Sequence, residues 1–253
     1  MKKRWMGIVF AWMALGFASL HAGQVTVAVA ANVSYALDDL KKAFAKEHPG
    51  IEIRTILGSS GKLTAQIGNG APYDLFMAAN MAYPEALYRG GTAVTKPKVY
   101  AKGALALLSP TPRDFDEGLK TLLSPSIRRI AVANPKAAPY GEAAVEALKK
   151  AGLYDQLRSK LIYGESVSQT LAYTLHAADV GIVAKSSLFS PKLRRFEKGK
   201  NWIDIDATLY RPIDQGIVLL KQAQKNPDAR AFYDFVLGKK AQAIFKAYGY
   251  LLP

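Results

Sequence analysis

The stretch Val25-Thr26-Val27-Ala28-Val29-Ala30-Ala31-Asn32-Val33-Ser34 decides the fold of this chain. Its first half is a short apolar run, which is typical of a buried strand in a parallel sheet. Its second half is a turn of small residues. The segment that follows places Leu37, Leu40 and Phe44 on one helical face, and Pro49-Gly50 ends it. The stretch therefore predicts a strand that passes directly into a helix.

The same alternation recurs along the chain. Strands are predicted near residues 51–57, 74–78, 129–133, 160–163 and 180–183, and helices near 62–68, 142–151, 168–176 and on both sides of Gly238. Repeated strand–helix–strand units with short links indicate parallel α/β sheets. Two more apolar strands, 104–108 and 216–220, stand outside these series and suit segments that cross between lobes. We therefore predict a two-lobed α/β protein.

Four short turns of small residues stand where a predicted strand passes into a helix. They are residues 30–34 (AANVS), 58–61 (GSSG), 138–141 (APYG) and 165–168 (ESVS). A helix N-terminus carries N–H groups without acceptors and a positive dipole end, so it can bind an anion. Each turn alone also fits an ordinary helix cap. Together they indicate a protein that captures a small oxyanion.

Residues 1–22 are predicted to be a cleaved signal peptide. Lys2, Lys3 and Arg4 precede the apolar run 5–20, and residues 20–22 suit a cleavage site. This run is shorter than the roughly 20 residues that span a bilayer. The chain has no cysteine, which excludes disulfides, thiolate metal sites and a lipid-carrying cysteine. We expect a protein of the periplasm, without a lipid anchor.

The net charge of +14 falls to +11 without the signal peptide, from 31 basic and 20 acidic residues. Such a charge is compatible with an anionic ligand and also with nucleic acid. The densest basic patch, 192–202, is interpreted as a solvated loop, because exported proteins rarely meet nucleic acid. We expect no nucleic-acid partner.

Catalytic signatures are mostly missing. The three histidines are His21, His48 and His176, and the last two stand near predicted helix ends, where histidines are common for electrostatic reasons. There is no phosphate-binding or dinucleotide-binding glycine motif. Residues 58–62 (GSSGK) are similar to a nucleophile elbow, but Lys62 replaces the closing glycine. A secreted hydrolase that uses Ser60 is therefore a weaker alternative, and we expect no enzyme and no cofactor.

The chain resembles the periplasmic molybdate/tungstate-binding proteins that serve ABC importers, over nearly all of its length after residue 22. The most specific segments are 30–32 (AAN), 58–63 (GSSGKL), 70–76 (GAPYDLF), 180–183 (VGIV), 231–235 (AFYDF) and 244–249 (IFKAYG). The resemblance implies a type II clamshell whose lobes are mixed, mainly parallel sheets flanked by helices. It places residues 23–103 and 217–253 in lobe I and residues 104–216 in lobe II. It also implies a monomer that delivers molybdate or tungstate to a permease in the inner membrane.

By the same resemblance, the oxyanion is held by Asn32 with the Ala31 backbone, and by Ser60, Tyr140 and Val167. The metal is then bound as the oxyanion, without direct side-chain coordination. The chain departs from a common family pattern twice: a serine often stands at Asn32, and a tyrosine at Ala184. Our hypothesis is that Tyr140 replaces the second hydroxyl. A sulfate-type receptor and a periplasmic sensor for the same ligand remain alternatives.

Overall fold

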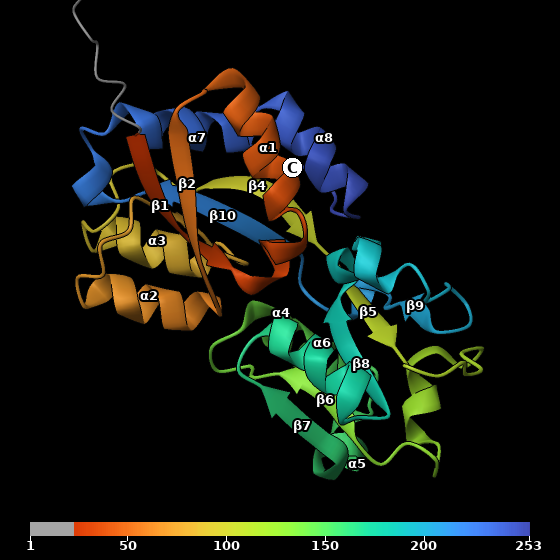
Figure 1. Cartoon of the computed structure of the whole chain (residues 1–253). Helices are drawn as coiled ribbons and strands as arrows, with labels where there is room; N and C mark the ends of the chain where they lie inside the picture. Colours follow the sequence, from red (N-terminus) through yellow and green to blue (C-terminus); the bar gives the residue numbers. More distant parts are fainter. Residues whose placement is uncertain (1–22) are drawn as a thin grey trace, which may run out of the picture.

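Two five-stranded sheets make up the frame of the described chain, residues 23–253, in this computed structural model (Figure 1). The first sheet has the order β2-β1-β3-β10-β4, with β1 (Gly23–Ala30), β2 (Ile51–Gly58), β3 (Leu75–Met77), β4 (Lys98–Gly103) and β10 (Ile213–Leu219). The second has the order β7-β6-β8-β5-β9, with β5 (Leu105–Leu108), β6 (Ile130–Ala133), β7 (Leu161–Gly164), β8 (Val180–Ala184) and β9 (Trp202–Asp204). The predicted signal peptide, 1–22, lies outside the described residues.

Both sheets are mixed. β1 pairs parallel with β2 and β3, and β6 pairs parallel with β7 and β8. β10 runs antiparallel to β3 and β4, and β5 runs antiparallel to β8 and β9. We call the part built on the first sheet the first lobe and the part built on the second sheet the second lobe. This arrangement confirms the predicted two-lobed α/β fold with mixed sheets, in each of which two strand pairs are parallel and two are antiparallel.

Helices cover both faces of each sheet. Around the first sheet they are α1 (Leu37–Glu47), α2 (Ser60–Gly68), α3 (Ala82–Arg89), α7 (Pro227–Leu237) and α8 (Lys239–Ala247). Around the second they are α4 (Pro139–Lys150), α5 (Tyr154–Leu157) and α6 (Val167–His176). In Figure 1, α1, α7 and α8 lie on one side of the first sheet, and α2 and α3 lie on the other. None of the helices within residues 23–253 combines the length and apolar character needed to cross a membrane.

The alternation of side chains along β1 explains this layering. Val25, Val27 and Val29 are fully buried in the core that α1, α7 and α8 share, whereas Ala28 faces the core under α2 and α3. Successive side chains of a strand point to opposite faces. Residues 27–30 are apolar and all buried, so this part of the strand is covered on both faces, in agreement with the buried strand that the sequence predicts.

The chain crosses between the sheets twice, from β4 to β5 and from β9 to β10. The two crossings lie side by side, because Ile213 at the start of β10 pairs with Gly103 at the end of β4. The predicted crossing strands 104–108 and 216–220 correspond to β5 and β10, which directly follow the crossings and belong to different sheets. β10 begins at Ile213, ahead of the predicted boundary at 217, since residues 213–216 pair with β4. The exact division of the chain into lobes stays a prediction.

Candidate functional site

The four predicted turns converge on one small cavity, of about 10 Å³, between the two lobes. All five predicted site residues line it: Ala31, Asn32, Ser60, Tyr140 and Val167. The other lining residues are Ala30, Gly58, Ser59, Ala79, Ala138 and Pro139. No charged side chain is among these described lining residues. The volume is below the roughly 300–1,000 Å³ of pockets for drug-sized ligands, so the cavity suits a small ligand.

Residues at the starts of helices line this cavity. Ser60 is the first residue of α2, Val167 the first of α6 and Tyr140 the second of α4. Asn32 is the second residue of a 3₁₀ helix, Ala31–Tyr35, that continues β1. N–H groups at these positions find no acceptor within their own helix, and the helix dipole makes this end positive. The cavity therefore offers hydrogen-bond donors and a positive potential without any formal charge.

The helix-cap interpretation is wrong for both Asn32 and Ser60. Neither the 3₁₀ helix nor α2 receives a side-chain cap, and the residue before α2 is Ser59. Ser60 Oγ instead accepts a hydrogen bond from the Ala79 N–H at 2.9 Å. At the turn before α6 the cap is Ser166, whose Oγ accepts from the Gln169 N–H at 3.3 Å. The Ser60 hydroxyl keeps its own proton for another acceptor.

The Asn32 side chain lies in a buried polar network. Its Nδ2 donates to Gln215 Oε1 at 2.8 Å and to the Tyr250 hydroxyl at 3.0 Å. Both amide protons are therefore engaged within the protein, while Oδ1 has no hydrogen-bond partner among the described residues. In this arrangement the Asn32 side chain has no proton left to donate into the cavity.

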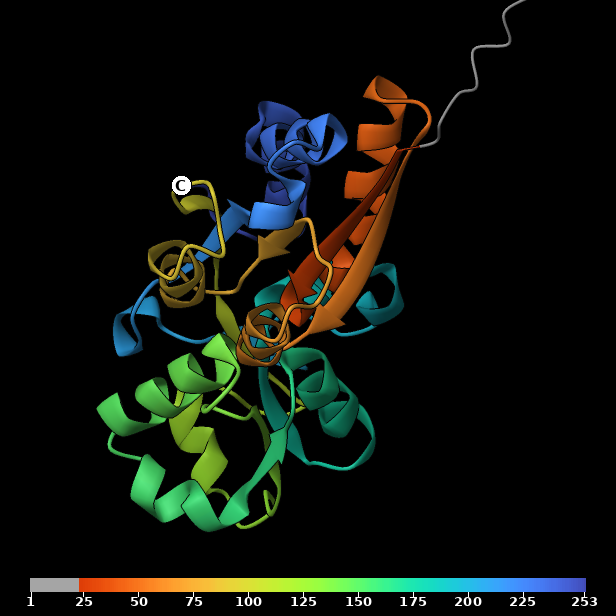
Figure 2. The ribbon, with the colours of Figure 1, turned by 90° about the vertical axis from the view of Figure 1, so that its left-hand side faces the viewer.

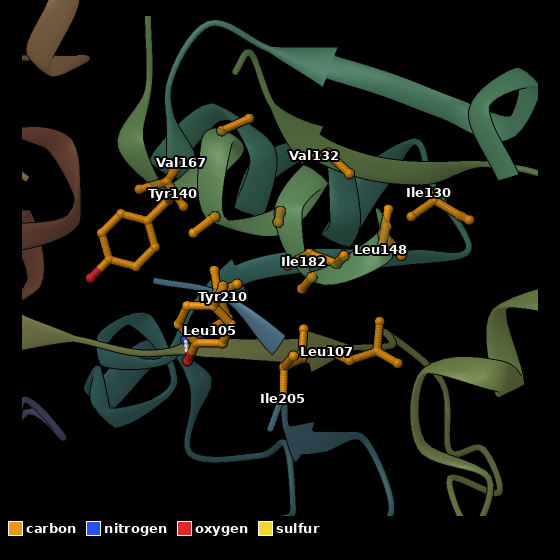
Figure 3. Close-up of a cluster of buried hydrophobic side chains, with 14 of the residues drawn as sticks. Leu105, Leu107, Ile130, Val132, Tyr140, Leu148, Val167, Ile182, Ile205 and Tyr210 are labelled. Atoms are coloured by element: carbon orange, nitrogen blue, oxygen red, sulfur yellow. Dashed lines mark hydrogen bonds between the residues drawn. The ribbon is translucent and has the colours of Figure 1, made fainter. Parts of the chain in front are cut away.

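Tyr140 is 2% exposed and joins the same network. Its hydroxyl accepts from Gln215 Nε2 at 3.1 Å, so its own proton is free to donate. Burial raises the pKa of Tyr140 well above its ordinary value, which keeps the phenol neutral. Figure 3 shows Tyr140 beside Val167 at one end of the second lobe's core, with its hydroxyl pointing away from the other side chains drawn.

Direct contacts hold the two lobes together around the cavity. In Figure 2 the lobes lie one above the other, and α2, in orange, lies at their boundary. The contacts are Gly61 N to Ala137 O (2.9 Å), Ser168 Oγ to Ala31 O (2.9 Å), Ser186 Oγ to Asn32 O (3.2 Å) and Lys62 Nζ to Glu165 Oε1 (2.6 Å). These contacts join the lobes on several sides of the cavity.

His48, His176 and the basic patch 192–202, which the sequence also offered as candidates, make ordinary structural contacts. The His48 ring stacks on Phe44 with 4.6 Å between centroids, and His176 ends α6. In residues 23–253 no group of three or more histidine, cysteine and acidic side chains could hold a metal ion. In the basic patch, Lys198 pairs with Asp204 at 2.6 Å. These contacts give no support to a catalytic or nucleic-acid site.

Sequence reasoning missed Gln215, Ser59 and Tyr250. Gln215 is fully buried in β10 and contacts residues of both lobes. A polar side chain at the start of a largely apolar strand, Ile213–Leu219, was a visible signal, because a buried amide needs hydrogen-bond partners. Ser59 lines the cavity, and no residue of the described chain hydrogen-bonds to its buried hydroxyl.

The comparisons with known proteins agree with this architecture. Residues 25–251 match the family of bacterial extracellular solute-binding proteins. The molybdate-binding protein ModA of Azotobacter vinelandii is 38% identical over 91% of this chain and 90% of its own length. ModA of Rhodobacter capsulatus is 35% identical over 91% of this chain and 89% of its own length.

Among solved structures, the periplasmic molybdate-binding protein of Azotobacter vinelandii superposes with a TM-score of 0.83 at 36% identity. The match covers 90% of this chain and 99% of that one. These similarities confirm the resemblance found in the sequence. The chain belongs to the family of bacterial extracellular solute-binding proteins.

Proposed function

We propose that this protein captures molybdate between its two lobes and delivers it to the permease of an ABC importer. The observation that carries the proposal is the small cavity between the lobes, which is lined by uncharged residues and helix N-termini from both lobes. The likeness to proteins named for molybdate binding supports it. Tungstate, a tetrahedral dianion of the same shape, is expected to bind as well. We expect a periplasmic monomer, exported by a cleaved signal peptide, that catalyses no reaction.

The ligand contacts that we propose come from both lobes. The first lobe contributes the backbone N–H groups of Ala31 and Asn32 and the Ser60 hydroxyl. The second contributes the Tyr140 hydroxyl and the Val167 N–H. Each of these groups is a donor, and each residue is at most 6% exposed. Charge-assisted hydrogen bonds to buried donors are about twice as strong as neutral ones, so a set of them can hold a desolvated dianion.

A site built from donors selects its anion by protonation. Hydrogen phosphate carries a proton that needs an acceptor, and leaving it unpaired in a buried cavity costs about 1–3 kcal/mol. Molybdate, tungstate and sulfate are fully deprotonated near neutral pH. Sulfate is smaller, so we expect the cavity to reject it by size.

Thermal unfolding of the purified protein with molybdate, tungstate, sulfate or phosphate tests the proposal. Ligand at ~1,000 times its dissociation constant adds roughly 4 kcal/mol to the free energy of unfolding. For a chain of this length that raises Tm by around 8–16 °C. Molybdate and tungstate should give this shift and phosphate none. A shift with sulfate alone would establish a sulfate-type receptor, and no shift with either metal oxyanion would contradict the proposal.

A further inference from the structure

We propose that Gln215 is a positioning residue that keeps the Tyr140 hydroxyl proton available to the ligand. The inference rests on the proposed function, because it concerns the same ligand. Gln215 contacts Asn32 of the first lobe and Tyr140 of the second, and both line the cavity. Its place in β10, just after the second crossing of the chain, allows it to reach both lobes.

The geometry around Gln215 is specific for an amide. Oε1 accepts from Asn32 Nδ2 and from the Tyr100 hydroxyl, each at 2.8 Å. Nε2 donates to the Tyr140 hydroxyl at 3.1 Å. An amide has one accepting end and one donating end, so it can receive two donors and still give a proton to a third group. A side chain that only accepts, or that has no polar atom, cannot do both.

The direction of the Gln215–Tyr140 bond decides what Tyr140 can offer the ligand. A phenol has one proton, and burial keeps that of Tyr140 in place. Because the Tyr140 oxygen accepts from Gln215, that bond does not use the phenol proton, which under the proposed function is donated to the anion. If residue 215 were an acceptor at this point, Tyr140 would donate to it and the cavity would lose a donor.

Close packing leaves the Gln215 and Tyr140 side chains little freedom to move. Gln215 is fully buried, and a Cβ built on Gly103 would overlap the Tyr140 hydroxyl and the Gln215 amide. The bare backbone at Gly103 thus lets the two side chains meet at hydrogen-bond distance. On the other side, Tyr250 accepts from Asn32 Nδ2 and donates to Asn32 O at 2.8 Å, which fixes the Asn32 amide as well.

A double-mutant cycle on the full protein tests the inference, with molybdate affinity measured by calorimetry. The variants are Gln215→Met, Tyr140→Phe and the pair. Loss of one hydrogen bond to a charged ligand weakens binding about 10- to 100-fold, so each single variant should show a loss in that range. Because Gln215 acts through Tyr140, the double variant should bind within about threefold of Tyr140→Phe.

Two further variants separate positioning from stability. Thr174→Val is the matched control, because Thr174 is fully buried in α6 and donates to Thr170 O at 2.8 Å, away from the cavity. It should lower Tm and leave molybdate affinity unchanged. Gln215→Glu keeps the shape and accepts from Tyr140, so it should lose affinity even if Gln215→Met does not fold.

The outcomes are distinguishable. Gln215 variants that bind molybdate within threefold of the wild type would overturn the inference, as would losses that multiply in the double variant. Failure of the wild-type protein to bind molybdate would instead overturn the proposed function.

Discussion

Replacement of Gly61 by alanine tests whether lobe closure forms the binding site. Gly61 lies in the first turn of α2, and its N–H donates across the lobe boundary to Ala137 O at 2.9 Å. A Cβ built on Gly61 would lie 3.0 Å from both Cα and O of Ala137, and 2.8 Å from the Tyr83 hydroxyl. The tyrosine can move, but the Ala137 backbone belongs to the other lobe. The overlap is therefore relieved when the lobes move apart.

The expected loss of molybdate binding free energy in Gly61→Ala has two parts. The cross-lobe hydrogen bond contributes about 1 kcal/mol, and relief of the overlap costs about 1–3 kcal/mol. Together these weaken molybdate binding by about 2–4 kcal/mol, which is roughly 30- to 1,000-fold in the dissociation constant. The free protein should keep its Tm within a few degrees, because an open arrangement of the lobes accommodates the methyl group.

Calorimetric titration with molybdate, together with Tm of the ligand-free protein, measures both effects. Gly68→Ala is the matched control, since Gly68 ends the same helix and no atom lies within 4 Å of its added Cβ. It should bind as the wild type does and be equally or more stable. Wild-type affinity in Gly61→Ala would refute the closure argument, as would a drop in ligand-free Tm large enough to explain the lost binding.

Three other variants or conditions probe the site and its surroundings. Tyr140→Phe should weaken molybdate binding about 10- to 100-fold through loss of a donor to a charged ligand; affinity equal to the wild type's would refute the role of that hydroxyl. Lys62→Met removes the exposed pair with Glu165, so calorimetry should show at most a fewfold loss that disappears in 1 M salt. Burial raises the pKa of Tyr100 and Tyr140 well above the ordinary value of 10.0. Above pH 10 the unfolded chain therefore loses protons that the native state keeps, and the free energy of unfolding falls by up to about 1.4 kcal/mol per pH unit for each tyrosine. Denaturant unfolding at pH 9 to 11 should show this slope, and Tyr100→Phe should reduce it; an unchanged slope would contradict the assignment.

Local sequence patterns were sufficient to predict most of the strands and helices of the two lobes. The apolar run of β1 and the spacing of Leu37, Leu40 and Phe44 in α1 each determine structure from neighbouring residues. The elements that were not predicted lack such signals. α3 (Ala82–Arg89) has no side-chain cap and carries Pro84 in its first turn, and β9 has three residues.

The lining of the candidate cavity was predictable from the sequence, but its hydrogen bonds were not. The small-residue turns mark the helix starts, and all five predicted residues line one cavity. The direction of the Asn32 amide, however, depends on Gln215 and Tyr250, which are 183 and 218 positions away in the sequence. No local pattern contains that information, because it arises only when β10 and the end of the chain pack beside the first turn.

A crystal structure of the protein grown with molybdate, with anomalous diffraction at the molybdenum absorption edge, tests the central claim most directly. Our account predicts one strong anomalous peak per chain in the cavity between Ser60 and Val167, with donors from both lobes around it. A peak at another place, or a crystal in which the lobes are closed and the cavity holds no molybdenum, would contradict the account.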